Sequence, residues 1–223
     1  MKELMKAKQP FQFYTRLHLT ELTGLRASIL SQLLDIIKKI PDSSIYHHTH
    51  RFLQQYEYLS PEPPNDFVYW VTEILGEEKL GKELSSINTI EYVSIHDLRQ
   101  KIVEVIEHYS KKHPLARVKF AKAGEEFHFL KSISFIIPTK YIANDLKEFS
   151  GILEKITIDS IYFHIFEARL RLGRGDNDFS NWIESSIGEK ELAEGISTLD
   201  PYTYTLEELR KTLLRIIEKS MSV

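Results

Sequence analysis

Apolar residues recur at helical spacing over most of this chain of 223 residues. Leu30, Leu33, Ile36, Ile37 and Ile40 follow one another at intervals of three or one, a pattern typical of an α-helix with one buried face. This spacing predicts a first helix that ends near residue 40, with Thr23 as its N-cap. Further helices are predicted from about residue 44, from 65 to 76 and from 94 to 110, with a short helix before the last one. Ser94-x-x-Asp97 opens this last helix, and Thr205-x-x-Glu208, which matches the capping-box pattern, opens its counterpart near the end of the sequence. The pattern therefore indicates a mainly helical protein.

The same pattern occurs twice along the chain. Three matched pairs of segments carry the likeness: Phe11-Gln12-Phe13 with Phe127-His128-Phe129, Ser44-Ile45-Tyr46-x-His48 with Ser160-Ile161-Tyr162-x-His164, and Asn65-Asp66-Phe67-x-x-Trp70 with Asn177-Asp178-Phe179-x-x-Trp182. Such self-similarity indicates a tandem repeat. We therefore divide the chain into an N-terminal tail (1–10), repeat 1 (11–110), a basic connector (111–126) and repeat 2 (127–223), and we expect the two repeats to pack as one compact unit.

The beginning of each repeat departs from the helical pattern. Apolar residues alternate there with other residues, at Phe11, Phe13, Leu17 and Leu19 in repeat 1 and at Phe127, Phe129, Ile133, Phe135 and Ile137 in repeat 2. A period of two is typical of a strand. The fold class that we predict is mainly α: two tandem helical repeats related by a pseudo-two-fold axis, with or without a short two-stranded β ribbon.

Composition and charge exclude several classes of protein. The chain has 29 Lys and Arg against 32 Asp and Glu, a net charge of −3, and no Cys. Disulfides, thiolate metal sites and a Cys nucleophile are therefore excluded. The phosphate-loop, dinucleotide-binding and nucleophile-elbow motifs do not occur. The sequence has no secretory signal and no apolar run of about 20 residues, so we expect a cytoplasmic protein with neither a membrane nor nucleic acid as partner. The sequence leaves the oligomeric state open.

The densest group of chemically useful side chains lies at the start of the second helix of each repeat. Tyr46 and His48 in repeat 1 recur as Tyr162 and His164 in repeat 2. Ligand pockets favour junctions between repeated units, so these four side chains are candidates for a cleft between the repeats. The structural alternative is that each shared His is buried and bonded to the backbone or to a Tyr.

A metal site is a second hypothesis for the same helices. His47 and His50 lie three residues apart, as do His164 and Glu167, and each pair shares one face of a helix. Two such pairs could supply four ligands to a transition metal such as zinc. The corresponding function is a metal-assisted hydrolase. Without that metal the sequence implies no cofactor.

Three arginines, Arg169, Arg171 and Arg174, precede the helix that begins after Asn177. Guanidinium groups beside a helix N-terminus form a plausible anion site, whereas the structural alternative is a solvated helix end. The function that we favour is therefore a binding module that holds an anionic small molecule or a protein partner at the cleft between the repeats. The Asp and Trp of the repeated Asn-Asp-Phe-x-x-Trp segment are interpreted as structural, as a helix-dipole residue and a core residue.

The segments Ser44–Phe52, Asn65–Trp70 and Glu167–Trp182 resemble a prokaryotic family of domains of unknown function. The likeness covers nearly the whole chain. The resemblance implies no activity, cofactor, partner or site residue, so the functional hypotheses depend on the residues alone.

Overall fold

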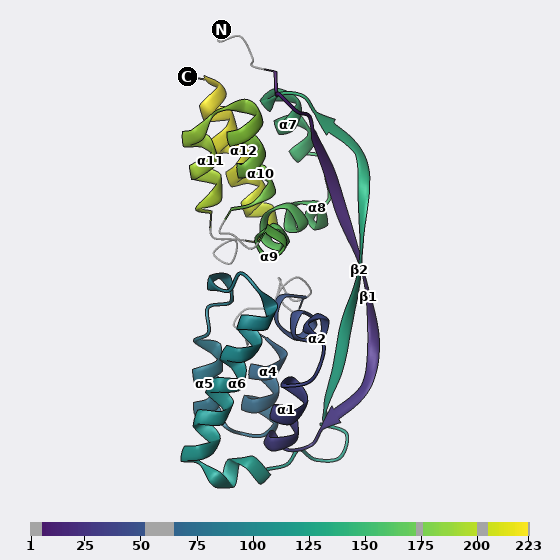
Figure 1. Cartoon of the computed structure of the whole chain (residues 1–223), viewed down its shortest axis with the longest axis vertical. Coiled ribbons are helices and arrows are strands. Elements are labelled where there is room, and N and C mark those ends of the chain that lie inside the picture. Colours follow the sequence, from purple (N-terminus) through teal and green to yellow (C-terminus); the bar gives the residue numbers. More distant parts are fainter. Residues whose placement is uncertain (1–5, 52–64, 173–175, 200–204, 223) are drawn as a thin grey trace. The chain divides into compact units, whose positions relative to one another are not determined.

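The computed structural model describes residues 6–51, 65–172, 176–199 and 205–222. Two strands, β1 (Phe11–Ala27) and β2 (Phe127–Ala143), pair with each other as a two-stranded sheet (Figure 1). Lys131 Nζ lies 2.9 Å from the carboxylate of Glu21, the Thr23 hydroxyl donates to the carbonyl of Phe129 at 2.6 Å, and the Thr139 hydroxyl donates to that of Phe13 at 2.8 Å. Residue numbers rise along one strand as they fall along the other, so the pairing is antiparallel.

The chain forms two compact units, and each strand contributes to both. Unit 1 consists of Met1–Leu17 and Ser134–Val223, and unit 2 consists of His18–Ile133. Each unit therefore contains the first part of one strand and the last part of the other. The division at 11–110 and 127–223 describes sequence likeness and stays a prediction about the repeat.

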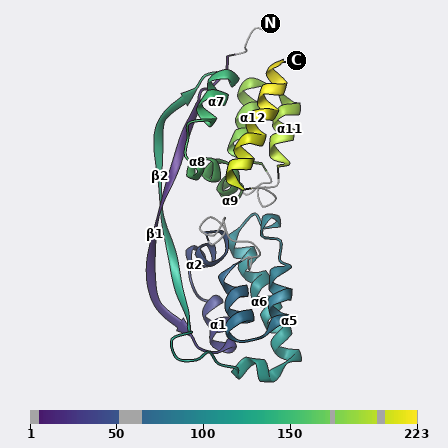
Figure 2. The ribbon, with the colours of Figure 1, turned by 180° about the vertical axis from the view of Figure 1, so that it is seen from behind.

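Unit 1 packs its helices around one buried apolar cluster. The helices are α7 (Leu146–Leu153), α8 (Ile158–Tyr162), α9 (Ala168–Leu172), α10 (Asp178–Trp182), α11 (Lys190–Ser197) and α12 (Leu206–Ser222), with π-helical turns at Phe163–Glu167 and Ile183–Ile187. Figure 2 shows α11 and α12 side by side. Phe11 and Phe13 of β1 belong to this cluster, together with Phe149, Phe179 and Trp182.

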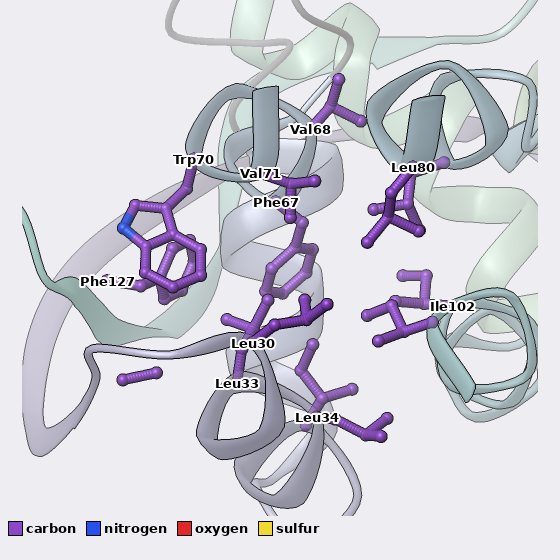
Figure 3. Packing of buried hydrophobic residues seen from close by; sticks show 14 of the residues in the cluster. Leu30, Leu33, Leu34, Phe67, Val68, Trp70, Val71, Leu80, Ile102 and Phe127 are labelled. Atoms are coloured by element: carbon purple, nitrogen blue, oxygen red, sulfur yellow. The ribbon is translucent and has the colours of Figure 1, made fainter. Parts of the chain in front are cut away.

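Unit 2 has a corresponding arrangement of elements. It contains α1 (Leu30–Ile37), α2 (Asp42–Tyr46), α4 (Asp66–Tyr69), α5 (Glu78–Ser85) and α6 (Ile95–Lys112), π-helical turns at His47–Arg51 and Trp70–Ile74, and 3-10 turns at Thr89–Glu91 and Pro114–Val118. Its cluster, part of which appears in Figure 3, contains Leu30, Leu33, Phe67 and Trp70 together with Phe127 of β2. Phe129 belongs to the same cluster.

The fold class predicted from the sequence is wrong. Two strands of 17 residues each form a long ribbon, so the chain is not a pair of helical repeats with at most a short ribbon. The apolar start of β1 packs among helices from residues 146–217, and the apolar start of β2 packs among helices from residues 30–109. The physical reason is that alternation predicts a strand but does not say which helices bury its apolar face.

Helix ends follow the sequence signals in part. Ser94 accepts a hydrogen bond from the amide of Asp97, and Thr205 and Glu208 bond each other's amides in the predicted capping box. The prediction for Thr23 is wrong, because this residue lies inside β1 and the first helix begins at Leu30. Its hydroxyl bonds the neighbouring strand instead of a helix end.

The two longest helices are amphipathic. α6 buries Leu98, Ile102 and Ile106, and α12 buries Leu209, Leu213 and Ile217, while their other faces carry charged side chains. Within the described ranges no helix is long and apolar enough to cross a membrane.

Candidate functional site

His164 joins three segments of unit 1 through its two ring nitrogens. The ring lies in the π-helical turn that follows α8, and it is almost fully buried. Nδ1 is 2.8 Å from the carboxylate of Asp178, the first residue of α10, and Nε2 accepts the backbone N–H of Tyr14 in β1 at 2.8 Å. Because Nε2 accepts a hydrogen bond, the proton of the neutral ring lies on Nδ1, and this N–H donates a hydrogen bond to the carboxylate of Asp178.

His48 makes the same set of contacts in unit 2. Its Nδ1 is 2.7 Å from the carboxylate of Asp66, and its Nε2 accepts the N–H of Leu130 in β2 at 2.9 Å. Each shared His therefore fastens a strand to two helical segments. Their positions in the sequence predicted a helix-dipole role for Asp66 and Asp178 and gave no sign of their hydrogen bonds to the His rings.

We expect His164→Phe to remove the hydrogen bonds to Asp178 and Tyr14, because a Phe ring can neither donate nor accept them. The partly buried N–H of Tyr14 loses its partner, which costs about 1 kcal/mol. Chemical denaturation should show this loss of unfolding free energy, and exchange of the Tyr14 amide should become faster. Asp178→Asn is the milder control, since the amide oxygen can still accept from Nδ1. An unchanged exchange rate at Tyr14 in His164→Phe would contradict the assignment.

Tyr46 and Tyr162 are buried and packed against other rings. Tyr46 is stacked on His50, with ring centroids 5.7 Å apart and planes within 6°, and on His18 at 5.7 Å. Tyr162 is stacked on Phe166 at 4.6 Å. In both units the ring that stacks on the Tyr belongs to the residue four positions later, His50 or Phe166.

The two histidines specific to repeat 1 are buried in unit 2. Nδ1 of His47 is 2.9 Å from the hydroxyl of Ser132, and burial, followed by the charge of nearby His48, lowers the pKa of His47 to about 4. Thr49 donates its hydroxyl proton to the carbonyl of Ile45, so its oxygen accepts from Nδ1 of His50 at 3.0 Å. The lowered pKa keeps the His47 ring neutral near pH 7, and the His50 ring is held by its hydrogen bond to Thr49.

The metal hypothesis fits these residues poorly. Nδ1 of His164 carries the ring proton and the lone pair of Nε2 accepts the Tyr14 amide, so the ring has no lone pair open to a metal while these bonds are made. Glu167 pairs with Arg16 of β1 within unit 1. In the part of the chain that the structure describes, no three His, Asp or Glu side chains are grouped to hold an ion. The metal site formed by His47, His50, His164 and Glu167 stays a prediction.

The structure places one arginine of the proposed anion cluster. Arg169 donates to the carbonyls of Ser197 and Leu199, at 2.8 and 3.3 Å, and so binds the end of α11. The side chain of Arg171, and Arg174 as a whole, lie outside the described residues. The anion cluster therefore stays a prediction.

A cleft of about 450 Å³ lies in unit 1 next to the His164–Asp178 pair. One side consists of β1 and the residues just before it, and the other side consists of α10 and the turn that follows. The lining residues are Gln9, Pro10, Phe11, Gln12, Tyr14, Ile136, Phe163, His164, Asp178, Asn181, Trp182, Ser185 and Ser186. Trp182 borders the cleft with its indole N–H bonded to the carbonyl of Gln9 at 2.7 Å. Among these described lining residues there is one carboxylate and no Lys or Arg.

Small polar side chains distinguish this cleft from the matching place in unit 2. When the segments Asn177–Gly188 and Asn65–Gly76 are aligned, the positions of Asn181, Ser185 and Ser186 hold Tyr69, Glu73 and Ile74. The sequence analysis missed the three cleft residues. A comparison of the two repeats could have revealed them. Both repeats keep the Asn-Asp-Phe-x-x-Trp segment, but side chains within it and just after it are shorter in repeat 2 and leave room for a ligand.

The arrangement defines a class of protein: a helical fold with two units that share an antiparallel ribbon and are each fastened to it by a His–Asp pair. The chain belongs to the family of unknown function DUF5752, whose model matches residues 8–218. This confirms the resemblance seen in the sequence. A solved structure, OrfY from Thermoproteus tenax, is similar at 30% identity with a TM-score of 0.82, covering 99% of this chain and 100% of that one. No curated protein matches the chain.

Proposed function

We propose that the chain is a non-catalytic binding protein and that the cleft of unit 1 holds its ligand. The observation that carries this proposal is the cleft itself: about 450 Å³ beside a fixed carboxylate, with Asn181, Ser185 and Ser186 at positions where unit 2 has Tyr69, Glu73 and Ile74. A volume of this size accommodates a small molecule. Asn181 and the two serines offer both donors and acceptors to such a ligand.

The His–Asp pair supports binding rather than proton transfer. A general base needs a nitrogen lone pair directed at its substrate. In His164 that lone pair is on Nε2 and accepts the Tyr14 amide, while the Nδ1 proton is directed at Asp178. The pair thus fixes the position of Asp178 at the edge of the cleft, which suits recognition by a preorganised group.

The charge of the lining favours a neutral or positively charged ligand. Asp178 accepts hydrogen bonds, and no Lys or Arg occurs among the described lining residues to balance an anion. A ligand rich in hydroxyl, amide or amine donors therefore fits better than a phosphate. The ligand proposed here differs from the anionic one expected from the sequence, which stays a prediction; Arg169, the arginine of that cluster that the structure places, binds backbone carbonyls.

A melting-temperature screen tests the proposal. Three groups of compounds are compared: neutral polyols, small primary amines, and phosphates. At about one hundred times its Kd a ligand stabilises the folded chain by about 2.7 kcal/mol, which for a chain of this size raises Tm by roughly 5–10 °C. We expect such a rise with a polyol or an amine and none with phosphate.

The variant Asn181→Tyr introduces the residue of unit 2 into the cleft and should abolish the rise. The matched control, Tyr69→Asn, makes the reverse exchange in unit 2 and should leave the rise intact. Stabilisation by phosphate alone would support the anionic hypothesis instead. A response that Asn181→Tyr leaves unchanged would place the ligand elsewhere and contradict the proposal.

A further inference from the structure

The segment 111–122 of unit 2 exposes three large apolar side chains within six residues. Leu115 is 86% exposed, Phe120 is 72% exposed and Val118 is 63% exposed. The segment covers the end of α6, the 3-10 turn Pro114–Val118 and the chain that leads towards β2 (Figure 1). Surface apolar residues scattered singly are ordinary, but three close together in sequence indicate a contact with a partner.

The backbone of this segment is held in place, so the exposure of its side chains is built into the fold. Ala116 and Ala121 are buried in the cluster of unit 2. The amide of Ala121 donates to the carbonyl of Ser28 at 2.8 Å, and Phe120 forms a β-bridge with Ile29. The small residues anchor the segment while Leu115, Val118 and Phe120 are directed to solvent.

Basic residues lie beside these apolar side chains in the sequence. The segment contains five basic residues and no Asp or Glu. Lys119 pairs with Glu77 at 3.2 Å. The ion pairs found among the described residues use none of the other four, which are Lys111, Lys112, Arg117 and Lys122.

We propose that the segment 111–122 binds the surface of an anionic lipid membrane. Lys and Arg are attracted to anionic headgroups, and apolar side chains beside them enter the boundary between headgroups and acyl chains. An acidic protein segment would meet the same charge. It would also need a groove for its own apolar side chains, whereas Leu115, Val118 and Phe120 protrude. The lipid surface is therefore the better fit.

The expectation that this protein has no membrane partner came from the lack of a spanning segment. Binding at the surface needs no such segment, since a few inserted apolar side chains and basic residues supply the attraction. This inference is independent of the ligand cleft, which lies in unit 1.

Co-sedimentation of the full chain with vesicles tests the inference. One set is an equal mixture of phosphatidylcholine and phosphatidylserine, and the other is phosphatidylcholine alone. We expect binding to the anionic set, weakened by salt because the charges are screened. Leu115→Ser with Phe120→Ser should lower the partition coefficient more than about tenfold. Lys111→Gln with Lys112→Gln should lower it roughly twentyfold and flatten the salt dependence.

The control is Leu22→Ser, which removes a side chain that is 74% exposed in the same unit but lies in β1. It should bind as the wild type does. Because all these side chains are exposed, melting curves should confirm that each variant folds. The inference is overturned if the chain does not bind anionic vesicles, or if both double variants bind them as well as the wild type does. It is also overturned if the chain binds polyglutamate and not the vesicles, which would point to an acidic protein partner.

Discussion

Replacing Phe13 with Ala should destabilise unit 1 and leave the helices of repeat 1 protected. Phe13 is fully buried, and its ring centroid lies 5.1 Å from that of Phe149 and 6.0 Å from that of Phe179. Removing a buried Phe costs about 3–5 kcal/mol, through lost transfer energy and the cavity left behind. Native-state hydrogen exchange should show faster exchange in α7, α10 and α12, with little change in α1, α4 and α6.

The matched experiment is Phe129→Ala, which should have the opposite distribution. Phe129 is buried in the cluster of unit 2, 4.8 Å from Phe127 between ring centroids. Its loss should weaken α1, α4 and α6. If Phe13→Ala instead loosened α1, α4 and α6 and Phe129→Ala loosened α7, α10 and α12, the packing of the start of each strand among the helices of the other half of the chain would be disproved.

The free energy of unfolding should fall as the pH is lowered from about 6.5 to 4, and protonation of His47 should account for a large part of this fall. The pKa of His47 falls from 6.5 to about 4 on folding because burial disfavours the charged ring. In that window the unfolded chain holds the proton and the folded chain does not, so stability falls as the pH falls. The loss levels off below pH 4 at up to about 3 kcal/mol.

The variant His47→Phe should remove this share of the acid sensitivity. Phe163 is the residue at the aligned position of repeat 2 and is buried in unit 1, so a Phe side chain suits the site. Urea unfolding at a series of pH values gives the slope for each protein. His96→Gln, which changes an exposed ring, should keep the wild-type slope. Parallel curves for the wild type and His47→Phe would contradict the prediction.

Local features of the fold were readable from the sequence. The N-cap at Ser94 and the capping box at Thr205 formed as predicted, because capping depends on residues three positions apart. Alternation at Phe11 and Phe13 indicated a strand correctly. The same alternation did not predict burial, since Leu17 and Leu19 continue it and are exposed. Twist turns the face of a long ribbon away from the helices that cover its end.

The sequence predicted some residues of the candidate site but not their partners. The sequence singled out His48 and His164, yet their partners Asp66, Asp178 and the strand amides lie far away in the chain. Asn181 and Ser185 carry no motif and become lining residues only because β1 packs opposite α10. Spacing along one helix cannot report such a contact.

By itself the sequence determined where the helices after Ser94 and Thr205 begin, that a strand starts at Phe11 and another at Phe127, and that His48 and His164 occupy matching positions. These properties depend on neighbours within a few residues, where periodicity and capping act. Only the tertiary structure decided that the start of β1 packs among the helices of residues 146–217 and the start of β2 among those of residues 30–109. Apolar burial is non-directional, so a strand of alternating Phe fits either set of helices. Chain connectivity and strand pairing make the choice.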